Sequence, residues 1–354
     1  MKLSSLFKGK AYAFSQAGDP EDDCKFAAAL LKKTDPNLEI KDIYLYSITD
    51  HYDVFMVLDN KERLFKLKIS LSDPDGFLER ESVTLRRNPC SSLPILLDYG
   101  TIKIGEEVTY LLTRVPNAES IRSHGRSCLT TNLNLFLKSY WVFAKSHNVK
   151  PTYKKILDHF TKNLIPQNSL SGESLEALKS YSDYGLCEKL LLDLRADILN
   201  RFEEIQKKLN KKCHANLSLD SIFYYGGGFY FDELHHVCMG HPYIDLCDLV
   251  IEMGGPTEND IPLWKSFCKS GSYPEDRELY SKVYELCIRK KLADLLISYI
   301  KEIYLYDSFR YEKIFYIADS FSHAYARFCR IESFKENKDF IMKTICEPIF
   351  GVKA

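Results

Sequence analysis

The sequence predicts an α+β fold in two lobes: a small lobe built on an antiparallel sheet, then a larger, mainly helical lobe with an embedded β-hairpin. Three observations support this prediction. Residues 39–114 carry short runs rich in Ile, Tyr, Val and Phe, separated by turn formers, as strands do. From about residue 127, apolar residues recur three and four positions apart, as in amphipathic helices. Residues 217–231 interrupt this pattern with β-prone side chains around three glycines.

The first lobe is predicted to run strand, strand, helix, strand, strand. The segments "YDVFMVL" and "RLFKLKIS" flank "DNKE", a polar link of hairpin length, which predicts two antiparallel strands. The next segment, "DPDGFLERESVTLRR", starts with turn formers and places Phe77, Leu78 and Leu85 among charged residues, which is typical of a short amphipathic helix. "LPILLDYG" and "VTYLLTRV" then predict two further strands.

The second lobe is predicted to be helical around one hairpin. Helical periodicity appears in "LNLFLKSYWVFAKSH", "SLEALKSYSDYGLCEKLLLDLRADILNRFEEIQKKL" and "KLADLLISYIKEIYLYDSF". We interpret Gly226-Gly227-Gly228 as a turn, because no helix follows that could offer amide donors to a phosphate. The predicted organisation is an N-terminal extension (1–36), a β-rich lobe (37–115) and a helical lobe (116–354).

Composition narrows the class of partner. The chain has 354 residues, 45% hydrophobic and 27% charged, which is ordinary for a globular protein with two cores. Lys and Arg total 48 against 49 Asp and Glu, so no global field favours nucleic acid or an anionic membrane. No stretch approaches the roughly 20 apolar residues of a membrane span. Eleven cysteines without a CxxC pair favour reduced thiols, so we expect a cytoplasmic protein.

Several segments, taken in order, carry a family resemblance. "LFKLKIS" and "FLERESVTLRR" are followed by "LPILLDYG" and "TYLLTRVPNAESI", then by "HANLSLDSIFY" and "HPYIDLCDLV". From about Ile43 to Ile251 this series resembles the aminoglycoside phosphotransferase and choline kinase family. The resemblance implies a two-lobed protein-kinase-like fold, with the catalytic-loop-like segment in 213–245 and a buried structural aspartate at Asp245.

The resemblance also implies cofactors, ATP and Mg²⁺, and residues that hold them. Lys68 takes the position of the phosphate-binding lysine and Glu81 that of the glutamate paired with it, while Lys66 is expected to lie on the surface. The metal-binding aspartate is assigned to Asp232, because an apolar strand precedes it. Counting back from Gly240-His241-Pro242 favours Glu233 instead, so Glu233 stays an alternative.

The catalytic loop keeps His214 but departs from the family at two positions. Asn216 stands where the family has its catalytic aspartate, and an amide cannot accept the proton of an acceptor hydroxyl. Ser221 stands at the metal-binding asparagine and is a weaker magnesium ligand. The phosphate-covering loop, "SITDHYD" (residues 47–53), has no glycine and carries Asp50 and Asp53.

Together these departures predict a pseudokinase-like protein whose phosphotransferase activity is impaired or absent and which acts by binding a nucleotide or a protein partner. The alternative is an active, atypical ATP- and Mg²⁺-dependent phosphotransferase acting on a hydroxyl of a small molecule, sugar or protein.

Two other patterns leave alternatives open. The segment "HHVCMGH" places four residues of zinc-binding types close together, namely His235, His236, Cys238 and His241. No second ligand pair follows at the spacing of a zinc site. The C-terminal part has a dense aromatic series, comprising Tyr299, Tyr304, Tyr306, Phe309, Tyr311, Phe315 and Tyr316. Either core packing or a groove for a protein partner would explain it.

Overall fold

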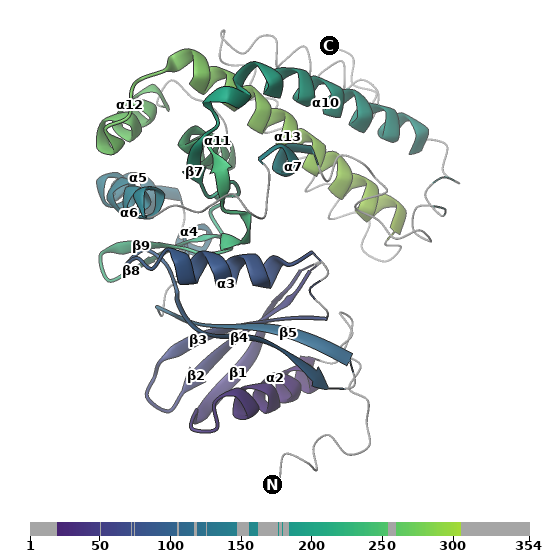
Figure 1. Ribbon diagram of the computed structural model, residues 1–354, viewed down its shortest axis with the longest axis vertical. Helices are drawn as coiled ribbons and strands as arrows, with labels where there is room; N and C mark the ends of the chain where they lie inside the picture. The colour runs from purple at the N-terminus through teal and green to yellow at the C-terminus, as the bar shows by residue number, and fades with distance from the viewer. Residues whose placement is uncertain are drawn as a thin grey trace. The chain divides into compact units, whose positions relative to one another are not determined.

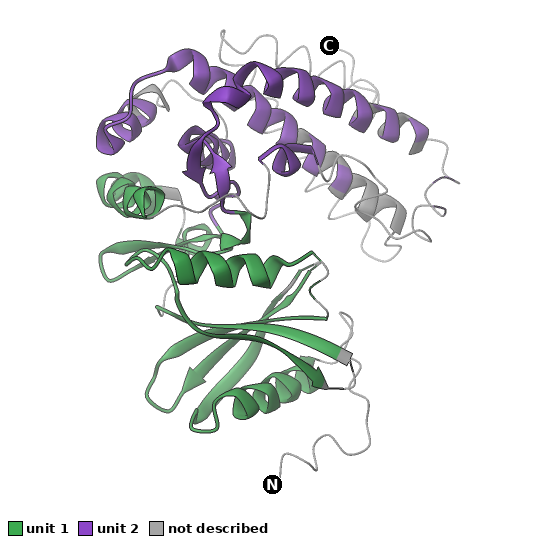
Figure 2. Cartoon of the chain, viewed as in Figure 1, with its two compact units in different colours: residues 1–149, 220–236 green, residues 150–219, 237–354 purple. Residues whose placement is uncertain are grey.

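The protein forms two compact units in a computed structural model. Unit 1 comprises residues 1–149 and 220–236, and unit 2 comprises residues 150–219 and 237–354 (Figure 2). The structure describes residues 20–49, 51–71, 73, 75–104, 106–116, 119–124, 126–146, 156–161, 176, 179, 184–253 and 260–305. The chain therefore leaves unit 1 after residue 149 and returns to it for residues 220–236.

A five-stranded antiparallel sheet is the centre of unit 1. Its strands are β1 (Ile40–Ile48), β2 (Asp53–Asp59), β3 (Leu64–Leu71), β4 (Ile95–Ile104) and β5 (Glu106–Val115). They lie in the order β1-β2-β3-β5-β4, and each neighbouring pair is antiparallel. The predicted hairpin of β2 and β3 is confirmed, and α3, β4 and β5 follow it in the predicted order, but a further strand, β1, precedes the hairpin and is missing from that order.

The two faces of this sheet pack against different helices (Figure 1). Because side chains alternate along a strand, Phe55, Val57 and Leu67 point to one face, where they form a core with Leu30 and Leu31 of α2 (Pro20–Thr34). The opposite face forms a smaller core and carries α3 (Phe77–Arg87). The Asp73 carboxylate starts α3 by accepting the backbone N–H groups of Phe77, Leu78 and Glu79 at 2.8, 3.1 and 3.2 Å.

A second, small sheet completes unit 1. It joins β6 (Glu119–Ser120) to the hairpin of β8 (Ile222–Tyr225) and β9 (Gly228–Phe231). The hairpin turns at Gly226 and Gly227, whose φ angles of 58° and 76° suit glycine, so the predicted glycine turn is confirmed. The other elements of unit 1 are α4 (Ile121–His124), α5 (Arg126–Thr131), α6 (Leu133–Lys145) and the 3-10 helix η3 (Leu234–His236).

Unit 2 is mainly helical. Its elements are α7 (Ile156–Thr161), α10 (Tyr184–Ile205), the 3-10 helix η2 (Gln206–Lys208), β7 (Lys211–Cys213), β10 (Cys238–Gly240), α11 (Pro242–Glu252), α12 (Asp260–Gly271) and α13 (Arg277–Leu305). Arg289 of α13 is buried and forms an ion pair with Asp197 of α10. No helix in the described ranges is long and apolar enough to span a membrane. Of the aromatic series, Tyr299 and Tyr304 belong to α13, and the members from Tyr306 onward lie outside the described residues.

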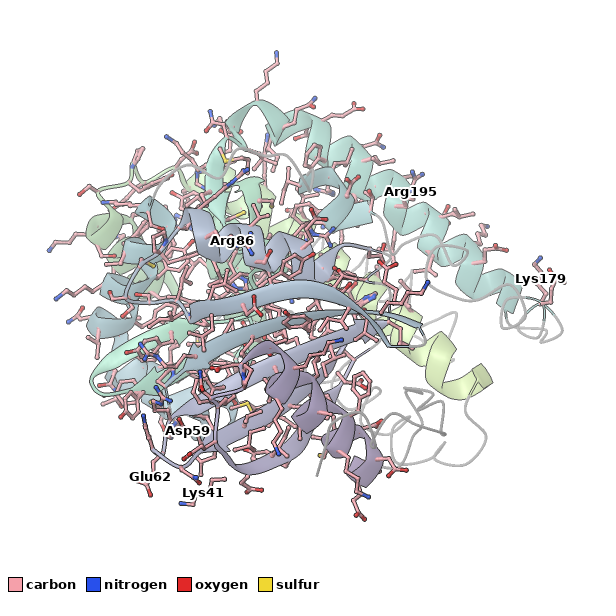
Figure 3. All side chains as sticks on the ribbon, turned by 60° about the horizontal axis from the view of Figure 1, so that its bottom comes forward. Lys41, Asp59, Glu62, Arg86, Lys179 and Arg195 are labelled. Carbon is pink, nitrogen blue, oxygen red and sulfur yellow. The ribbon has the colours of Figure 1, made fainter. Side chains whose placement is uncertain are left out.

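Ordinary surface charges surround the large sheet. Lys41 of β1 and Glu62 of the β2–β3 turn form an exposed ion pair with a 3.7 Å Nζ–Oε1 distance (Figure 3). Such exposed pairs contribute little to stability, because water screens them and both side chains lose conformational freedom. The pair therefore serves as a reference for the buried charges described next.

Candidate functional site

Four charged side chains meet beneath the sheet of unit 1: Lys66, Lys68, Glu81 and Asp232, here called the charged cluster. Lys66 and Lys68 are two residues apart on β3, so both point to the face that carries α3. Lys68 Nζ lies 2.9 Å from each carboxylate oxygen of Glu81 and 3.3 Å from Asp232 Oδ1. Lys66 Nζ donates to Asp232 Oδ2. Asp232 thus bridges the two lysines, and Glu81 holds one of them.

Burial makes the cluster an electrostatic unit. Lys66, Lys68, Glu81 and Asp232 are only 5%, 2%, 0% and 5% exposed. Burial by itself lowers the pKa of Lys68, but the charges of Asp232 and Glu81 outweigh it and raise that pKa well above the usual range. Burial raises the pKa of Asp232, and the neighbouring Lys66 and Lys68 overcome this and lower it. Lys68 and Asp232 are therefore charged at neutral pH.

The expectation that Lys66 is a surface residue is wrong. Its side chain is buried, its ammonium contacts Asp232, and it lies 4.9 Å from the centre of the Phe223 ring. The physical reason is that Asp232 comes from a distant segment, the end of β9, and supplies the charge that allows a lysine to be buried there. The two-residue spacing from Lys68 was the available signal, since it predicts a shared face for both lysines.

Two further side chains beside the cluster were not identified from the sequence. Lys68 Nζ lies 5.2 Å from the centre of the Tyr52 ring, a cation–π distance. His235 Nδ1 lies 3.6 Å from Glu81 Oε2, and Arg80 donates to the His235 carbonyl at 3.3 Å. Tyr52 and His235 are both buried. Tyr52 therefore lies beside the ammonium of the Lys68–Glu81 pair and His235 beside its carboxylate.

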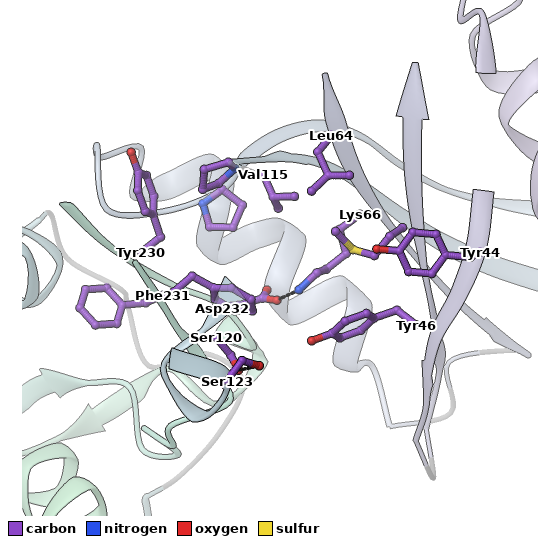
Figure 4. A pocket seen from close by; sticks show the side chains of 14 residues that line it. Tyr44, Tyr46, Leu64, Lys66, Val115, Ser120, Ser123, Tyr230, Phe231 and Asp232 are labelled. Carbon is purple, nitrogen blue, oxygen red and sulfur yellow. Dashed lines mark hydrogen bonds and ion pairs between the residues drawn. The ribbon is translucent and has the colours of Figure 1, made fainter. Parts of the chain in front are cut away.

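A pocket of about 360 Å³ opens beside Lys66 and Asp232, and unit 1 alone lines it. Figure 4 shows Lys66 reaching toward Asp232, with Tyr44 and Tyr46 beyond the lysine and Tyr230 and Phe231 on the other side of the carboxylate. The volume lies within the range of small-molecule sites, which are mostly apolar with a few polar groups. This pocket has that character: aromatic and aliphatic walls with one ion pair and two serines, Ser120 and Ser123.

The loop between β1 and β2 is closed on itself. Thr49 N–H and its hydroxyl donate to the Tyr52 carbonyl at 3.1 and 2.6 Å. The N–H groups of His51 and Tyr52 donate to Thr49 Oγ1 at 3.2 and 3.0 Å. These backbone donors are already used within the loop, which therefore does not offer them to a phosphate. Asp50 lies outside the described residues, and Asp53 is buried on β2, with the charge of buried Asp23 of α2 acting on it.

Asp232 also lies next to Ser221. The Asp232 N–H donates to the Ser221 carbonyl at 3.0 Å, and both residues are buried. Glu233, the alternative metal ligand, follows with φ of 58° and is less buried than Asp232. Asp232 and Ser221 provide the hard oxygen atoms that Mg²⁺ prefers, so they fit such an ion by type. The charge of the carboxylate, however, is already balanced by ammonium groups.

In unit 2, the catalytic-loop-like segment is held by Asp245. The N–H groups of His214 and Ala215 donate to the two carboxylate oxygens of Asp245, each at 2.7 Å. Asp245 is 0% exposed, so the predicted buried structural aspartate is confirmed. Ala215 has φ of 60°, an uncommon conformation that these two hydrogen bonds stabilise. His214 is also buried, so its loop has a fixed backbone frame.

Asn216 lines a small cavity of about 60 Å³ within unit 2, together with Asp248 and Lys290. Burial raises the pKa of Asp248 to about 7, although the charge of Lys290 opposes the shift. A carboxyl group therefore lies in the surroundings of Asn216, even though the residue at position 216 is itself an amide.

The zinc interpretation of "HHVCMGH" has no support from the geometry. Within the part of the chain that the structure describes, no three His, Cys, Asp or Glu side chains gather closely enough to hold a metal ion. His241 Nδ1 instead accepts the Tyr243 N–H at 3.1 Å and caps α11, and burial lowers its pKa to about 4. Cys238 lies opposite Cys213 in the β10–β7 pair.

Of the comparisons with known proteins, only the one with solved structures finds similar proteins. No protein-family model matches the chain, and no curated protein matches it. Among solved structures, the ADP and streptomycin complex of an aminoglycoside phosphotransferase APH(3'')-Id from Streptomyces rimosus has a TM-score of 0.52 at 14% identity, covering 77% of this chain and 98% of that one.

Two further structures are similar. The GDP and kanamycin complex of APH(2")-IIia gives a TM-score of 0.53 at 13% identity, covering 88% of this chain and 99% of that one. Amicoumacin kinase hAmiN, in complex with AMP-PNP, Ca²⁺ and Ami, gives 0.52 at 12% identity, covering 86% and 95%. The chain has the two-lobed aminoglycoside phosphotransferase and protein-kinase-like fold, which confirms the fold class predicted from the sequence.

Proposed function

We propose that this protein is a pseudokinase-like member of the phosphotransferase fold that binds a nucleotide and has impaired or absent phosphotransferase activity. The observation that carries the proposal is the contrast between an intact Lys68–Glu81–Asp232 arrangement and an amide at position 216. In the proposed function, the first provides positive charge for a nucleotide phosphate, and the second lacks the base that an acceptor hydroxyl needs.

Nucleotide binding is supported by the pocket and its neighbours. The similar structures contain ADP, GDP or AMP-PNP, and one also contains Ca²⁺. In this chain, the aromatic and aliphatic walls of the pocket suit a base, and Lys66 and Asp232 supply charge at its edge. If Mg²⁺ binds, Asp232 with Ser221 beside it would hold the ion in competition with the Lys66 ammonium, and the ion would neutralise phosphate charge.

Loss of catalysis is supported at three places. Asn216 cannot take a proton, and losing general-base help typically lowers a rate by about 10²- to 10⁴-fold. Ser221 offers a hydroxyl where an amide oxygen would bind a metal better. In the loop from Thr49 to Tyr52, the backbone N–H groups of His51 and Tyr52 donate to Thr49 Oγ1 and so are not available to a phosphate. Each change weakens a different requirement of phosphoryl transfer, so their effects on the rate accumulate.

A thermal-shift series tests the binding half of the proposal. A ligand at 100 times its Kd stabilises a protein by about 2.7 kcal/mol, which is a readily measured shift. We expect ADP or ATP to stabilise the wild-type chain and to have no effect on a Lys68→Met variant, while Lys41→Met, which alters the exposed reference pair, responds like the wild type. Absence of any shift with all nucleotides would refute nucleotide binding.

An active, atypical phosphotransferase is the second candidate, and Asp248 is the observation that favours it. This carboxyl lines the same cavity as Asn216, and its pKa of about 7 suits a general base at neutral pH. The candidate predicts ATP turnover with a hydroxyl acceptor that falls at least about 100-fold in Asp248→Asn. No turnover with sugars, amino alcohols or protein hydroxyls would leave the pseudokinase-like function.

Two further expectations complete the proposal. The near balance of 48 basic and 49 acidic residues predicts a protein that binds neither nucleic acid nor an anionic membrane, and the eleven cysteines without a CxxC pair predict a cytoplasmic one. Binding of a protein partner through the helical lobe stays a prediction from the aromatic series, much of which lies outside the described residues.

A further inference from the structure

Lys66 points into the pocket of unit 1 rather than into solvent. Its ammonium contacts Asp232 and lies 4.9 Å from the centre of the Phe223 ring and 6.0 Å from that of the exposed Tyr46 ring. Figure 4 shows this ion pair lying between the tyrosines of β1 and the end of β9. A lysine held so firmly by a carboxylate and two aromatic rings is a built part of the pocket.

The positive and negative side chains of the charged cluster balance one another, so a further cation is not required to neutralise the carboxylates. Lys66 and Lys68 face Glu81 and Asp232, so two positive and two negative side chains form a buried group with no net charge. A divalent ion entering at Asp232 has to compete with both ammonium groups. If it displaces Lys66, it also leaves a buried ammonium without its partner, which is costly in a buried site.

We propose that Lys66 is a tethered cation that competes with a divalent metal for Asp232, so that this chain binds a nucleoside diphosphate without requiring the metal. The metal half of this inference concerns the protein alone, and the nucleotide half rests on the proposed function. Lys66 occupies Asp232 with a positive charge, as a divalent ion would, and Lys68 provides a second ammonium group beside it. Asp232, the carboxylate assigned to metal binding, instead holds the Lys66 ammonium group.

Manganese binding to the nucleotide-free full-length chain tests the competition, with free Mn²⁺ measured by electron paramagnetic resonance. We expect Mn²⁺ affinity to rise about tenfold, equal to about 1.4 kcal/mol, when Lys66→Met removes the ammonium. Lys66→Met combined with Asp232→Asn should lose this gain, and Lys41→Met should match the wild type. Lys66→Gln keeps a hydrogen-bond donor for Asp232 and carries the test if Lys66→Met does not fold. Equal Mn²⁺ affinity in the wild type and the Lys66 variants would overturn the proposal.

Calorimetry with ADP, in EDTA and then in excess Mg²⁺, tests the nucleotide half. We expect the wild-type Kd for ADP to differ by less than about threefold between the two conditions, and the Lys66→Met Kd to become about tenfold tighter with Mg²⁺ than without it. ADP binding to the wild type only in Mg²⁺ would overturn the inference. Absence of ADP binding in both conditions would refute the proposed function, while the Mn²⁺ result would still decide whether Lys66 and metal compete.

Discussion

The charged cluster of unit 1 and the loop held by Asp245 in unit 2 differ in which of the side chains expected from the family resemblance they contain. In the cluster, both the geometry and the charges are present, with Lys68 2.9 Å from Glu81 and 3.3 Å from Asp232. In the loop, the backbone frame is present, with two 2.7 Å hydrogen bonds to Asp245, but position 216 carries an amide. The frame of this loop does not depend on the side chain at position 216, because backbone N–H groups make the hydrogen bonds that hold it.

The largest expected effect comes from breaking the cluster. Lys68→Met leaves Glu81 buried without its main partner, so the free energy of unfolding of unit 1 should fall by about 3 to 5 kcal/mol. Urea unfolding measures this change. Lys41→Met removes the exposed lysine of the 3.7 Å pair with Glu62 and should cost less than about 1 kcal/mol. Equal costs for the two variants would show that the cluster is not a buried unit.

Removing the loop frame should have the next largest effect. Asp245→Asn keeps one acceptor oxygen but turns the other into a donor, so one of the two backbone N–H groups loses its partner. We expect a loss of about 2 to 3 kcal/mol, because buried hydrogen bonds to charged groups are strong. Asp193→Asn, on the exposed surface of α10, is the control for urea unfolding of unit 2. An effect no larger than that of the control would remove Asp245 as the determinant of the loop.

Replacing Asp53, a buried carboxylate outside both regions, should stabilise the protein rather than destabilise it. Asp53 is 1% exposed, and burial, with the charge of Asp23, raises its pKa to about 6. The unfolded carboxyl titrates near 3.9, so the folded protein binds more protons between about pH 4 and pH 6, and stability falls as pH rises through that window. Asp53→Asn should therefore stabilise unit 1 by about 2 to 3 kcal/mol at pH 7 relative to its effect at pH 4.

Urea unfolding at both pH values measures this difference. Asp42→Asn, at an exposed position of β1, is the control and should change little between the two conditions. A stabilisation by Asp53→Asn that is the same at pH 4 and pH 7 would show that the carboxyl does not titrate in this window.

The smallest expected effect is at an exposed ion pair of unit 1. Arg122 Nε lies 2.7 Å from both carboxylate oxygens of Asp220, with side chains 48% and 56% exposed. Arg122→Ala should change stability by less than about 1 kcal/mol, because solvent screens such a pair. A loss as large as that of Lys68→Met in the same assay would contradict the distinction between surface and buried charges.

The fold was largely predictable because its signals are local. Short β-prone runs, the "DNKE" link and the glycine turn each define an element without distant contacts. The pairing of Lys68 with Glu81 followed from the family resemblance, and the structure contains that contact. The roles of Asp232, Ser221, His214 and Asn216 stay predictions, since they concern ligands and chemistry.

The parts that were missed depend on distant segments. Burial of Lys66 requires a carboxylate 166 residues further along the chain, which no local pattern of β3 reveals. The closed loop between β1 and β2 depends on the Thr49 hydroxyl, which accepts the N–H groups of His51 and Tyr52. Such a side-chain hydrogen bond uses backbone donors that could otherwise bind elsewhere. The cavity shared by Asn216 and Asp248 joins segments on either side of the hairpin. In each case the sequence shows the residue types but not their contacts.

The most direct test of the central claim is ATP turnover in the wild type and in an Asn216→Asp, Ser221→Asn double variant. We expect both proteins to bind ATP. The wild type should show no Mg²⁺-dependent turnover above solution hydrolysis, and the double variant should turn ATP over. Wild-type turnover that disappears in Lys68→Met would contradict this expectation, because the existing site would then be catalytic with an amide at position 216.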